Sequence, residues 1–289
     1  MERKTNMKLS TRMLVLLSLM AIGLIVATLV AYLMPDMGLL AALTLQDVLA
    51  FILPAVAAMA IFYRRPLHAM CLDSAPGWKW ILIVVLFYLV SLPAMNWLVD
   101  FNAGMKLPSW MSGVENWMKA SEDLADESTK QLLDIHSVGM LLITVFVVGF
   151  MAGLSEEILF RGAIQRTMQD SRLNIHFVIW FVALIFSAFH MQFYGFIPRM
   201  MLGAWLGYLL VWSRSLWVPI IAHTLNNSTV VFMSYLANKD VVAKDMGDTL
   251  GLPAEGQFPW LALCSIALSI ALAVCAGRYF RNSEKKRQI

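Results

Sequence analysis

VGMLLITVFVVGFMAGLSEEILFRGAIQRTMQ, residues 138–169, is the stretch of sequence that decides the fold. Its first half is an unbroken apolar run, and roughly 20 such residues are enough for a helix to cross a bilayer. Its second half keeps the apolar background but contains Glu156, Glu157 and Arg161. Each charge inside a membrane helix costs about 3 kcal/mol on insertion scales, so charges kept there need a reason. The stretch therefore predicts a membrane helix that carries functional groups.

The composition of the whole chain agrees with a membrane protein. Of the 289 residues, 60% are hydrophobic and 14% are charged, and the mean hydropathy is +0.69. A soluble domain has roughly 25% charged residues, so this chain has too few charges for a surface in water. The net charge of +3 comes from basic residues scattered between apolar runs, which argues against nucleic-acid binding. The cysteines Cys71, Cys264 and Cys275 show no spacing of a disulfide framework or a cysteine metal site.

Eight apolar segments are predicted to be membrane helices. They cover residues 13–34, 48–63, 80–99, 138–169, 176–192, 196–212, 216–236 and 258–277. The first is too long for a typical signal peptide and has no clear cleavage site, so we interpret it as a retained span. The longest polar segment, 100–134, contains a candidate surface helix at Glu122–Lys130. We predict an all-α polytopic membrane protein with about eight transmembrane helices and one membrane domain over residues 1–289.

Lysine and arginine residues are divided unevenly between the two predicted sides of the membrane. Of the 22, 16 fall on the side of the two termini, and six fall on the other side: Lys106, Lys119, Lys130, Arg199, Lys239 and Lys244. Loops rich in Lys and Arg stay in the cytoplasm, so both termini are predicted to be cytoplasmic. The acidic segment 100–134 is then expected outside.

The two adjacent glutamates are expected to have different environments, because neighbouring helix positions point about 100° apart. Glu157 and Arg161 have the i, i+4 spacing of a helical ion pair. Glu156 has no partner within its helix. One interpretation is a structural carboxylate that pairs with another helix or faces a water-filled crevice. The other is a general base, because a carboxylate shielded from bulk water becomes a stronger base.

Two histidines lie in apolar segments that the predicted topology brings near Glu156. Glu156 and His190 are 34 positions apart, and the turn-like Ser171–Asn174 lies midway between them. A hairpin there places both residues roughly 20 Å from the turn, at 1.5 Å per residue. His223 follows a second turn at residues 213–215, and Asn227 lies one helical turn above it on the same face.

These polar residues suggest water activation. Taken singly, each histidine is equally well explained as a hydrogen-bonded helix-packing residue. Together with a spare glutamate, His190 and His223 can activate water by hydrogen bonding, or the three can hold Zn²⁺. The Asn227 amide can donate to a developing oxyanion. His68, His136 and His176 are weaker candidates because they lie in a loop or near span ends, and Gly203 with Gly207 is interpreted as a close helix-packing face.

Three motifs carry a family resemblance. EEILFR (156–161), FSAFH (186–190) and HTLNN (223–227) resemble the EExxxR, FxxxH and HxxxN-type motifs of the CAAX-protease and bacteriocin-processing family (CPBP, or Abi). This is a family of intramembrane proteases, and the order and spacing of the motifs are also similar. The motif-bearing core covers about residues 138–236.

The resemblance implies a role for each motif residue. Glu156 would activate the attacking water with His190 as its partner, while His223 and Asn227 would stabilise the oxyanion. The other two charged residues of the first motif, Glu157 and Arg161, would support the structure of the site.

The metal requirement and the substrate stay open at this point. Members of the family have been described both as metalloproteases and as metal-independent glutamate proteases, and this sequence has no HExxH motif that would argue directly for zinc. If a metal is used, the candidate ligands are Glu156, His190 and His223. The expected function is a multi-pass endopeptidase of a bacterial cytoplasmic membrane that cleaves a peptide or a membrane-associated protein. Prenylated substrates are not implied.

Two other classes of protein are alternatives to the enzyme. One is a non-catalytic membrane immunity or scaffold protein of the same fold. The other is a proton-coupled transporter, whose acid and histidines would relay protons near the middle of the membrane. Broken helices in paired repeats would favour transport. Pro54 and Pro219 are present, but no internal repeat is visible, so the transporter is the less favoured alternative.

Overall fold

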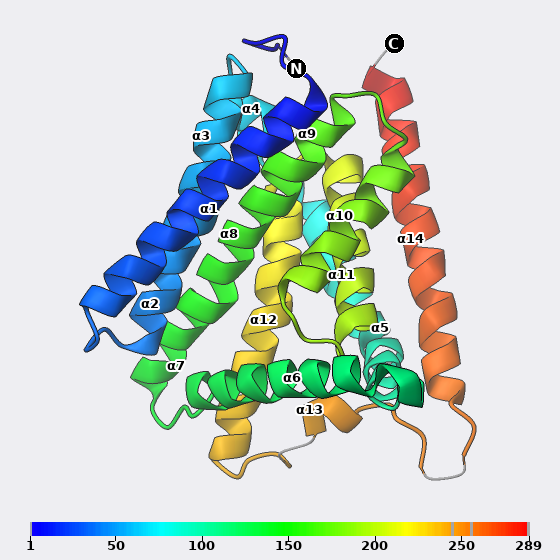
Figure 1. Cartoon of the computed structure of the whole chain (residues 1–289). Helices are drawn as coiled ribbons and strands as arrows, with labels where there is room; N and C mark the ends of the chain where they lie inside the picture. Colours follow the sequence, from blue (N-terminus) through cyan, green and yellow to red (C-terminus); the bar gives the residue numbers. More distant parts are fainter. Residues whose placement is uncertain (1, 244–245, 255–256, 288–289) are drawn as a thin grey trace.

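Helices make up most of the structure, a computed structural model that describes residues 2–243, 246–254 and 257–287. Within these residues the β-structure is a single bridge between Arg3 and Tyr63. Long helices lie side by side, with α1 (Leu9–Leu33) and α14 (Trp260–Arg287) at opposite sides of the bundle (Figure 1). The two chain ends lie at the same end of the bundle (Figure 1).

The predicted membrane spans are present as helices. In the described residues, five stretches are long and apolar enough to cross a membrane: Leu9–Leu33, Leu39–Phe62, Trp78–Ala103, Val138–Gln169 and Trp260–Phe280. The other three predicted spans form α10 (Ile175–Phe189), α11 (Phe196–Ser213) and α12 (Trp217–Asn238). The first of these is shorter, and the other two carry polar residues such as Arg199 and His223 within the helix. The prediction of an all-α polytopic membrane protein is confirmed.

The second span begins earlier than the sequence indicated. It consists of α2 (Leu39–Gln46), η1 (Asp47–Ile52) and α3 (Leu53–Phe62), so the predicted start at Val48 was wrong. Asp47 lies just before the predicted start, but in the structure it is inside the helix and is 7% exposed. Its carboxylate accepts a hydrogen bond of 2.8 Å from the Ser155 hydroxyl, which compensates for its burial.

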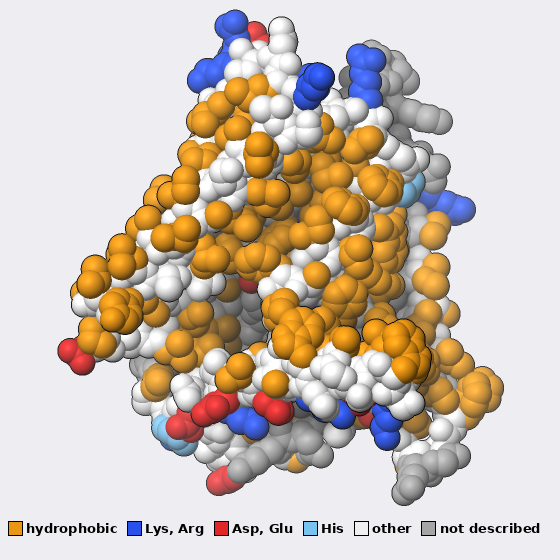
Figure 2. All heavy atoms as spheres, in the orientation of Figure 1, with side chains coloured by type: hydrophobic (Ala, Val, Ile, Leu, Met, Phe, Trp, Pro, Cys, Tyr) orange, Lys and Arg blue, Asp and Glu red, His pale blue; other side chains and the backbone are white. Residues whose placement is uncertain are grey.

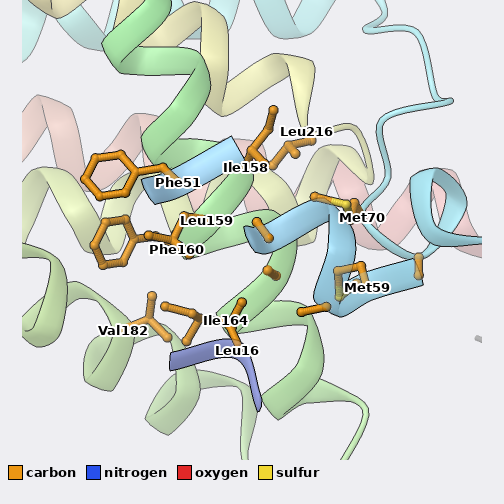
Figure 3. Close-up of a cluster of buried hydrophobic side chains, with 14 of the residues drawn as sticks. Leu16, Phe51, Met59, Met70, Ile158, Leu159, Phe160, Ile164, Val182 and Leu216 are labelled. Atoms are coloured by element: carbon orange, nitrogen blue, oxygen red, sulfur yellow. The ribbon is translucent and has the colours of Figure 1, made fainter. Parts of the chain in front are cut away.

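The fourth span is one long helix made of several segments. These are α7 (Val138–Thr144), η3 (Val145–Met151), α8 (Ala152–Glu157), η4 (Ile158–Gln165) and α9 (Arg166–Gln169). A short turn at residues 170–174 then leads into α10, where the sequence predicted a hairpin. Figure 3 shows side chains of η4 packed with Leu16 of α1, Phe51 of η1, Met59 of α3 and Val182 of α10.

The small residues of α11 allow it to pack closely on α10. A Cβ atom added at Gly203 would lie 3.2 Å from the Cα atom of Ala183, and one at Gly207 would lie 3.0 Å from Cγ2 of Ile179. Larger side chains would push the two helices apart. The predicted close-packing face of Gly203 and Gly207 is confirmed.

The polar segment between the third and fourth spans forms a helix across one end of the bundle. α6 (Ser112–Leu132) lies nearly perpendicular to the long helices, at the end opposite the two termini (Figure 1). It is longer than the predicted 122–130 because apolar side chains such as Trp117 extend its amphipathic pattern toward the N-terminus. The ring of Trp117 lies 5.0 Å from that of Phe193, in the loop that follows α10.

Candidate active site

The helix that carries the two glutamates is wound unevenly around them. α8 is flanked by two π-helical stretches, η3 and η4. Such turns are rare and are found mainly as insertions in α-helices at functional sites. In this setting the Glu157 side chain is completely buried, while 17% of the Glu156 side chain is exposed. The different environments predicted for the adjacent glutamates are present.

Glu156 is the meeting point of the three motifs. Its Oε2 atom lies 3.9 Å from Nε2 of His190 and 3.8 Å from Nε2 of His223. This oxygen is buried and has no hydrogen-bond partner among the described residues. Three helices, α8, α10 and α12, therefore bring one carboxylate oxygen and two imidazole nitrogens around a single point.

The His190 ring is oriented by the backbone of its own helix. Its Nδ1 atom lies 2.8 Å from the Phe186 carbonyl oxygen, one turn earlier. A carbonyl oxygen can only accept a hydrogen bond, so Nδ1 carries the hydrogen. In the neutral ring, Nε2 then presents a lone pair toward Glu156.

The His223 ring is oriented by the second glutamate. Its Nδ1 atom lies 2.9 Å from Oε1 of Glu157, and the same oxygen accepts a 2.7 Å hydrogen bond from Nη1 of Arg161. The i, i+4 ion pair predicted from the sequence is therefore present, with both side chains fully buried. The contact between Glu157 and His223 was not predicted, because the 66 positions between them show no helical spacing.

The Phe186 ring occupies the space between the charged groups. It lies 4.4 Å from the Arg161 guanidinium carbon, a distance at which a cation and a ring attract one another. Its centroid is 4.9 Å from the His190 ring and 5.8 Å from the His223 ring. The second motif therefore supplies two groups to the site: the His190 imidazole, and the Phe186 ring that packs against both histidines.

Asn227 lies on α12 beside the fourth span. Its Nδ2 atom donates a hydrogen bond of 3.3 Å to the Val148 carbonyl oxygen of η3. Its Oδ1 atom accepts one of 3.1 Å from the Asn226 amide. An amide nitrogen has two hydrogens, so this arrangement leaves a second hydrogen of Asn227 for another acceptor.

Two glycines that the sequence interpretation overlooked allow α12 to approach the fourth span. A Cβ atom added at Gly153 would lie 3.2 Å from the Thr224 backbone nitrogen, and one at Gly149 would collide with the Ser228 hydroxyl. Gly149 and Gly153 are spaced i, i+4, which is a GxxxG pattern that the sequence already contains. This close approach brings His223 to the glutamates.

We expect Gly153→Leu to destabilise the protein by about 1–3 kcal/mol, because the added side chain must push α12 away. Thermal unfolding in detergent would measure the effect. Gly139→Leu is the matched control, since no atom lies within 4 Å of a Cβ added at Gly139 on the same long helix. Equal stability of the two variants would contradict the importance of this contact.

A further acid beside the site was also missed. Asp47 of η1 binds the Ser155 hydroxyl, and Ser155 immediately precedes Glu156. The signal in the sequence is a lone carboxylate at the edge of an apolar run, one position before the predicted start of the second span. The structure therefore contains one more carboxylate near the site than the motifs indicate.

The three candidate metal ligands do not form a ready metal site. No group of three His, Cys, Asp or Glu side chains in the described part of the chain has the geometry to hold a metal ion. The separations of 3.8 and 3.9 Å also exceed the roughly 3.4 Å between ligands that follows from Zn–N and Zn–O bonds of about 2.1 Å in a tetrahedron. The predicted ligand set is not supported by this geometry.

The surface of the bundle is hollowed on the face shown in Figure 2. The hollow lies between the long helices above α6, and an acidic side chain is visible inside it. Hydrophobic side chains cover most of the surrounding surface (Figure 2). An opening on this apolar face would meet lipid if the long helices span a bilayer.

These observations define a polytopic membrane protein with an acid–histidine cluster inside its helix bundle. Residues 138–229 match the family model described as type II CAAX prenyl endopeptidase Rce1-like. This segment contains all three motifs, and the match confirms the resemblance to the CPBP family that the motifs indicated.

A curated relative points to the same class of protein. "Putative membrane peptidase YdiL" of Bacillus subtilis (strain 168) is 30% identical over 108 residues. The alignment covers 37% of this chain and 43% of the relative, which is less than half of each. No solved structure matches this chain.

Proposed function

We propose that this protein is a membrane endopeptidase that cleaves a peptide bond in a peptide or a membrane-associated protein. The observation that carries the proposal is the convergence of Glu156, His190 and His223 on one partly buried point. The family model and the relative named as a membrane peptidase support the same class of activity.

Glu156 and His190 are suited to activate water. Their separation of 3.9 Å is too long for a direct hydrogen bond, and a polar gap of this length suits a bridging water. Both atoms are acceptors, so the water would donate one hydrogen to each. Its oxygen lone pair would then be free to attack a carbonyl carbon.

His223 is suited to the opposite role of donor. Its Nδ1 atom lies 2.9 Å from Oε1 of Glu157, and its Nε2 atom lies 3.8 Å from Oε2 of Glu156. Carboxylate oxygens accept hydrogen bonds, so a His223 ring with hydrogen on both nitrogens would be a donor on both sides. Its Nε2–H and the second Asn227 amide hydrogen could then stabilise the oxyanion.

The proposed reaction conserves atoms and protons. The water oxygen forms a bond to the carbonyl carbon, and the proton it loses passes to Glu156. The carbon–nitrogen bond then breaks, and Glu156 returns the proton to the leaving nitrogen. The first products are a carboxylic acid, which keeps the second hydrogen of the water, and a free amine; transfer of that proton from the acid to the amine gives a carboxylate and an ammonium group.

Hydrolysis can be tested with the purified full-length chain in lipid nanodiscs. Incubation with a library of apolar and membrane-associated peptides in oxygen-18 water, followed by mass spectrometry, would reveal new termini. A hydrolase should place one heavy oxygen in the new carboxylate at the time of cleavage. Fragments without heavy oxygen, or fragments that form equally without the protein, would contradict the proposal.

We expect Asn227→Ala to lower the turnover number by about 10²-fold, because one oxyanion donor is lost. KM should change little, since the donor acts mainly on the transition state. Peptide cleavage kinetics would measure both constants. Thr229→Ala is the control on the same helix, because the Thr229 hydroxyl binds the Leu225 carbonyl of its own helix. A similar loss in the two variants would indicate a general effect on α12.

A further inference from the structure

A basic pocket lies at the end of the bundle where both termini are found. It is formed by the N-terminal segment, the first turn of α1 and the turn after α9, and its volume is about 730 Å³. Four of its lining side chains are basic, namely Arg3, Lys8, Arg12 and Arg172, and one is acidic, Asp170. The pocket therefore has an excess of positive charge. None of these residues belongs to the acid–histidine cluster.

The floor of the pocket contains a buried guanidinium. Arg12 is 1% exposed, and its Nη1 atom donates to Tyr63 at 2.9 Å and to Asp170 at 3.0 Å. Its Nη2 atom donates to the Ser171 hydroxyl at 2.8 Å, but its Nε atom has no partner among the described residues. Arg3 binds the same Asp170 carboxylate at 2.5 Å. One carboxylate is thus shared between two guanidinium groups.

The rim of the pocket contains two exposed cations and an uncapped helix start. Lys8 precedes α1, and no side chain caps the first turn of that helix, so its backbone N–H groups remain available to an anion. Arg172 has a φ of 62°, a left-handed conformation for which glycine or asparagine is usual after a helix. Residue 172 is nevertheless an arginine, which places a positive charge at the rim.

The depth of the pocket indicates which anion it would meet. The apolar helix α1 begins at Leu9, and the long helix of the fourth span ends at Gln169. The pocket lies at these two ends, where the polar headgroups border the hydrocarbon of a bilayer. Basic pockets at this level bind anionic headgroups.

We propose that this pocket binds the phosphate group of an anionic lipid headgroup, such as that of phosphatidylglycerol. The first-turn N–H groups of α1 contact the phosphate, Lys8 and Arg172 enclose it from the rim, and the buried Arg12 guanidinium adds positive charge beneath it. Bound lipid then links the start of α1 to the turn between the fourth and fifth spans.

The test is lipid binding to the purified full-length chain in phosphatidylcholine nanodiscs. Native mass spectrometry after addition of increasing phosphatidylglycerol would give the affinity. We expect Lys8→Ala and Arg172→Ala each to weaken binding about fivefold, since a basic residue near an anionic lipid contributes that order of affinity. Both side chains are exposed, so the fold should be unaffected.

Two controls show whether lipid binding depends on this pocket, and not on general attraction to a basic surface or on the acid–histidine cluster. Arg65→Ala removes an exposed arginine that does not line the pocket, and it should leave the affinity unchanged. Glu156→Gln should bind the lipid as the wild type does, so this proposal stands whether or not the chain is a peptidase. An equal affinity for phosphatidylglycerol in all variants, or no preference over phosphatidylcholine, would overturn the proposal.

A third experiment distinguishes binding of a lipid from binding of free phosphate. Inorganic phosphate at the same concentration should neither displace phosphatidylglycerol nor raise the unfolding temperature, because it lacks the acyl chains that hold a lipid at this depth. Displacement of the lipid by inorganic phosphate at an equal concentration would show a site for soluble phosphate and overturn the lipid assignment.

Discussion

Glu156→Gln is expected to lower the rate of peptide cleavage by at least about 10²-fold, because it removes the proton acceptor while keeping the size of the side chain. The Oε2 atom of Glu156 is the point on which both histidine Nε2 atoms converge. Cleavage kinetics on a peptide found with the wild-type protein would measure the loss.

Two further measurements make the Glu156→Gln result specific. Binding of the same peptide should survive, since the amide fits the space of the carboxylate. Glu127→Gln is the matched control, because Glu127 is an exposed glutamate of α6 and should retain full cleavage. Full biological activity of Glu156→Gln would reject the enzyme and leave the non-catalytic scaffold of the same fold.

Arg161→Ala is expected to destabilise the protein by about 3–5 kcal/mol, because it leaves the buried Glu157 carboxylate without its cation. Both side chains are 0% exposed, and Arg161 also donates a 3.0 Å hydrogen bond to the Gly203 carbonyl oxygen. Thermal or denaturant unfolding in detergent would measure the loss. Arg166→Ala on the same helix should have a smaller effect, since its half-buried guanidinium binds the Ala69 carbonyl and the Gln169 amide oxygen instead of a buried charge.

A double substitution tests whether the loss of stability comes from the unpaired charge of Glu157. Glu157→Gln combined with Arg161→Met removes both charges, and it should recover much of the stability that Arg161→Ala loses. Cleavage should recover less than stability, because the Glu157 carboxylate also binds His223 at 2.9 Å. In contrast, Glu156→Gln alone should unfold near the wild-type temperature. Equal destabilisation by Glu156→Gln and Arg161→Ala would contradict the different roles assigned to the two glutamates.

The features of the fold that follow from local sequence were predictable. Apolar run length located the long helices, and the turn residues 171–174 located the hairpin that brings Glu156 and His190 together. The i, i+4 spacing identified the pairing of Glu157 with Arg161. In each case the partners lie on one helix or are joined by one short turn, so distance along the chain determines distance in space.

The features that depend on contacts between distant helices were not predictable in the same way. The bond from Glu157 to His223 requires the depth and rotation of two helices to be known together. Asp47 fell outside the predicted span because a carboxylate beside an apolar run resembles the end of a span unless its partner Ser155 is known. Gly149 and Gly153 have GxxxG spacing, but this spacing alone does not show which distant helix packs against them.

The placement of Glu157 and Arg161 on a single helix also has a consequence for how the chain is made. A newly synthesised segment enters the bilayer before its final neighbours are present, and a lone charge would oppose that entry. These two residues are one helical turn apart, so they can neutralise each other as soon as the segment coils. His223 is not needed for this step, because its helix is synthesised later. The two charges that are completely buried among the described residues are therefore carried into the membrane as a pair that requires no assembled bundle.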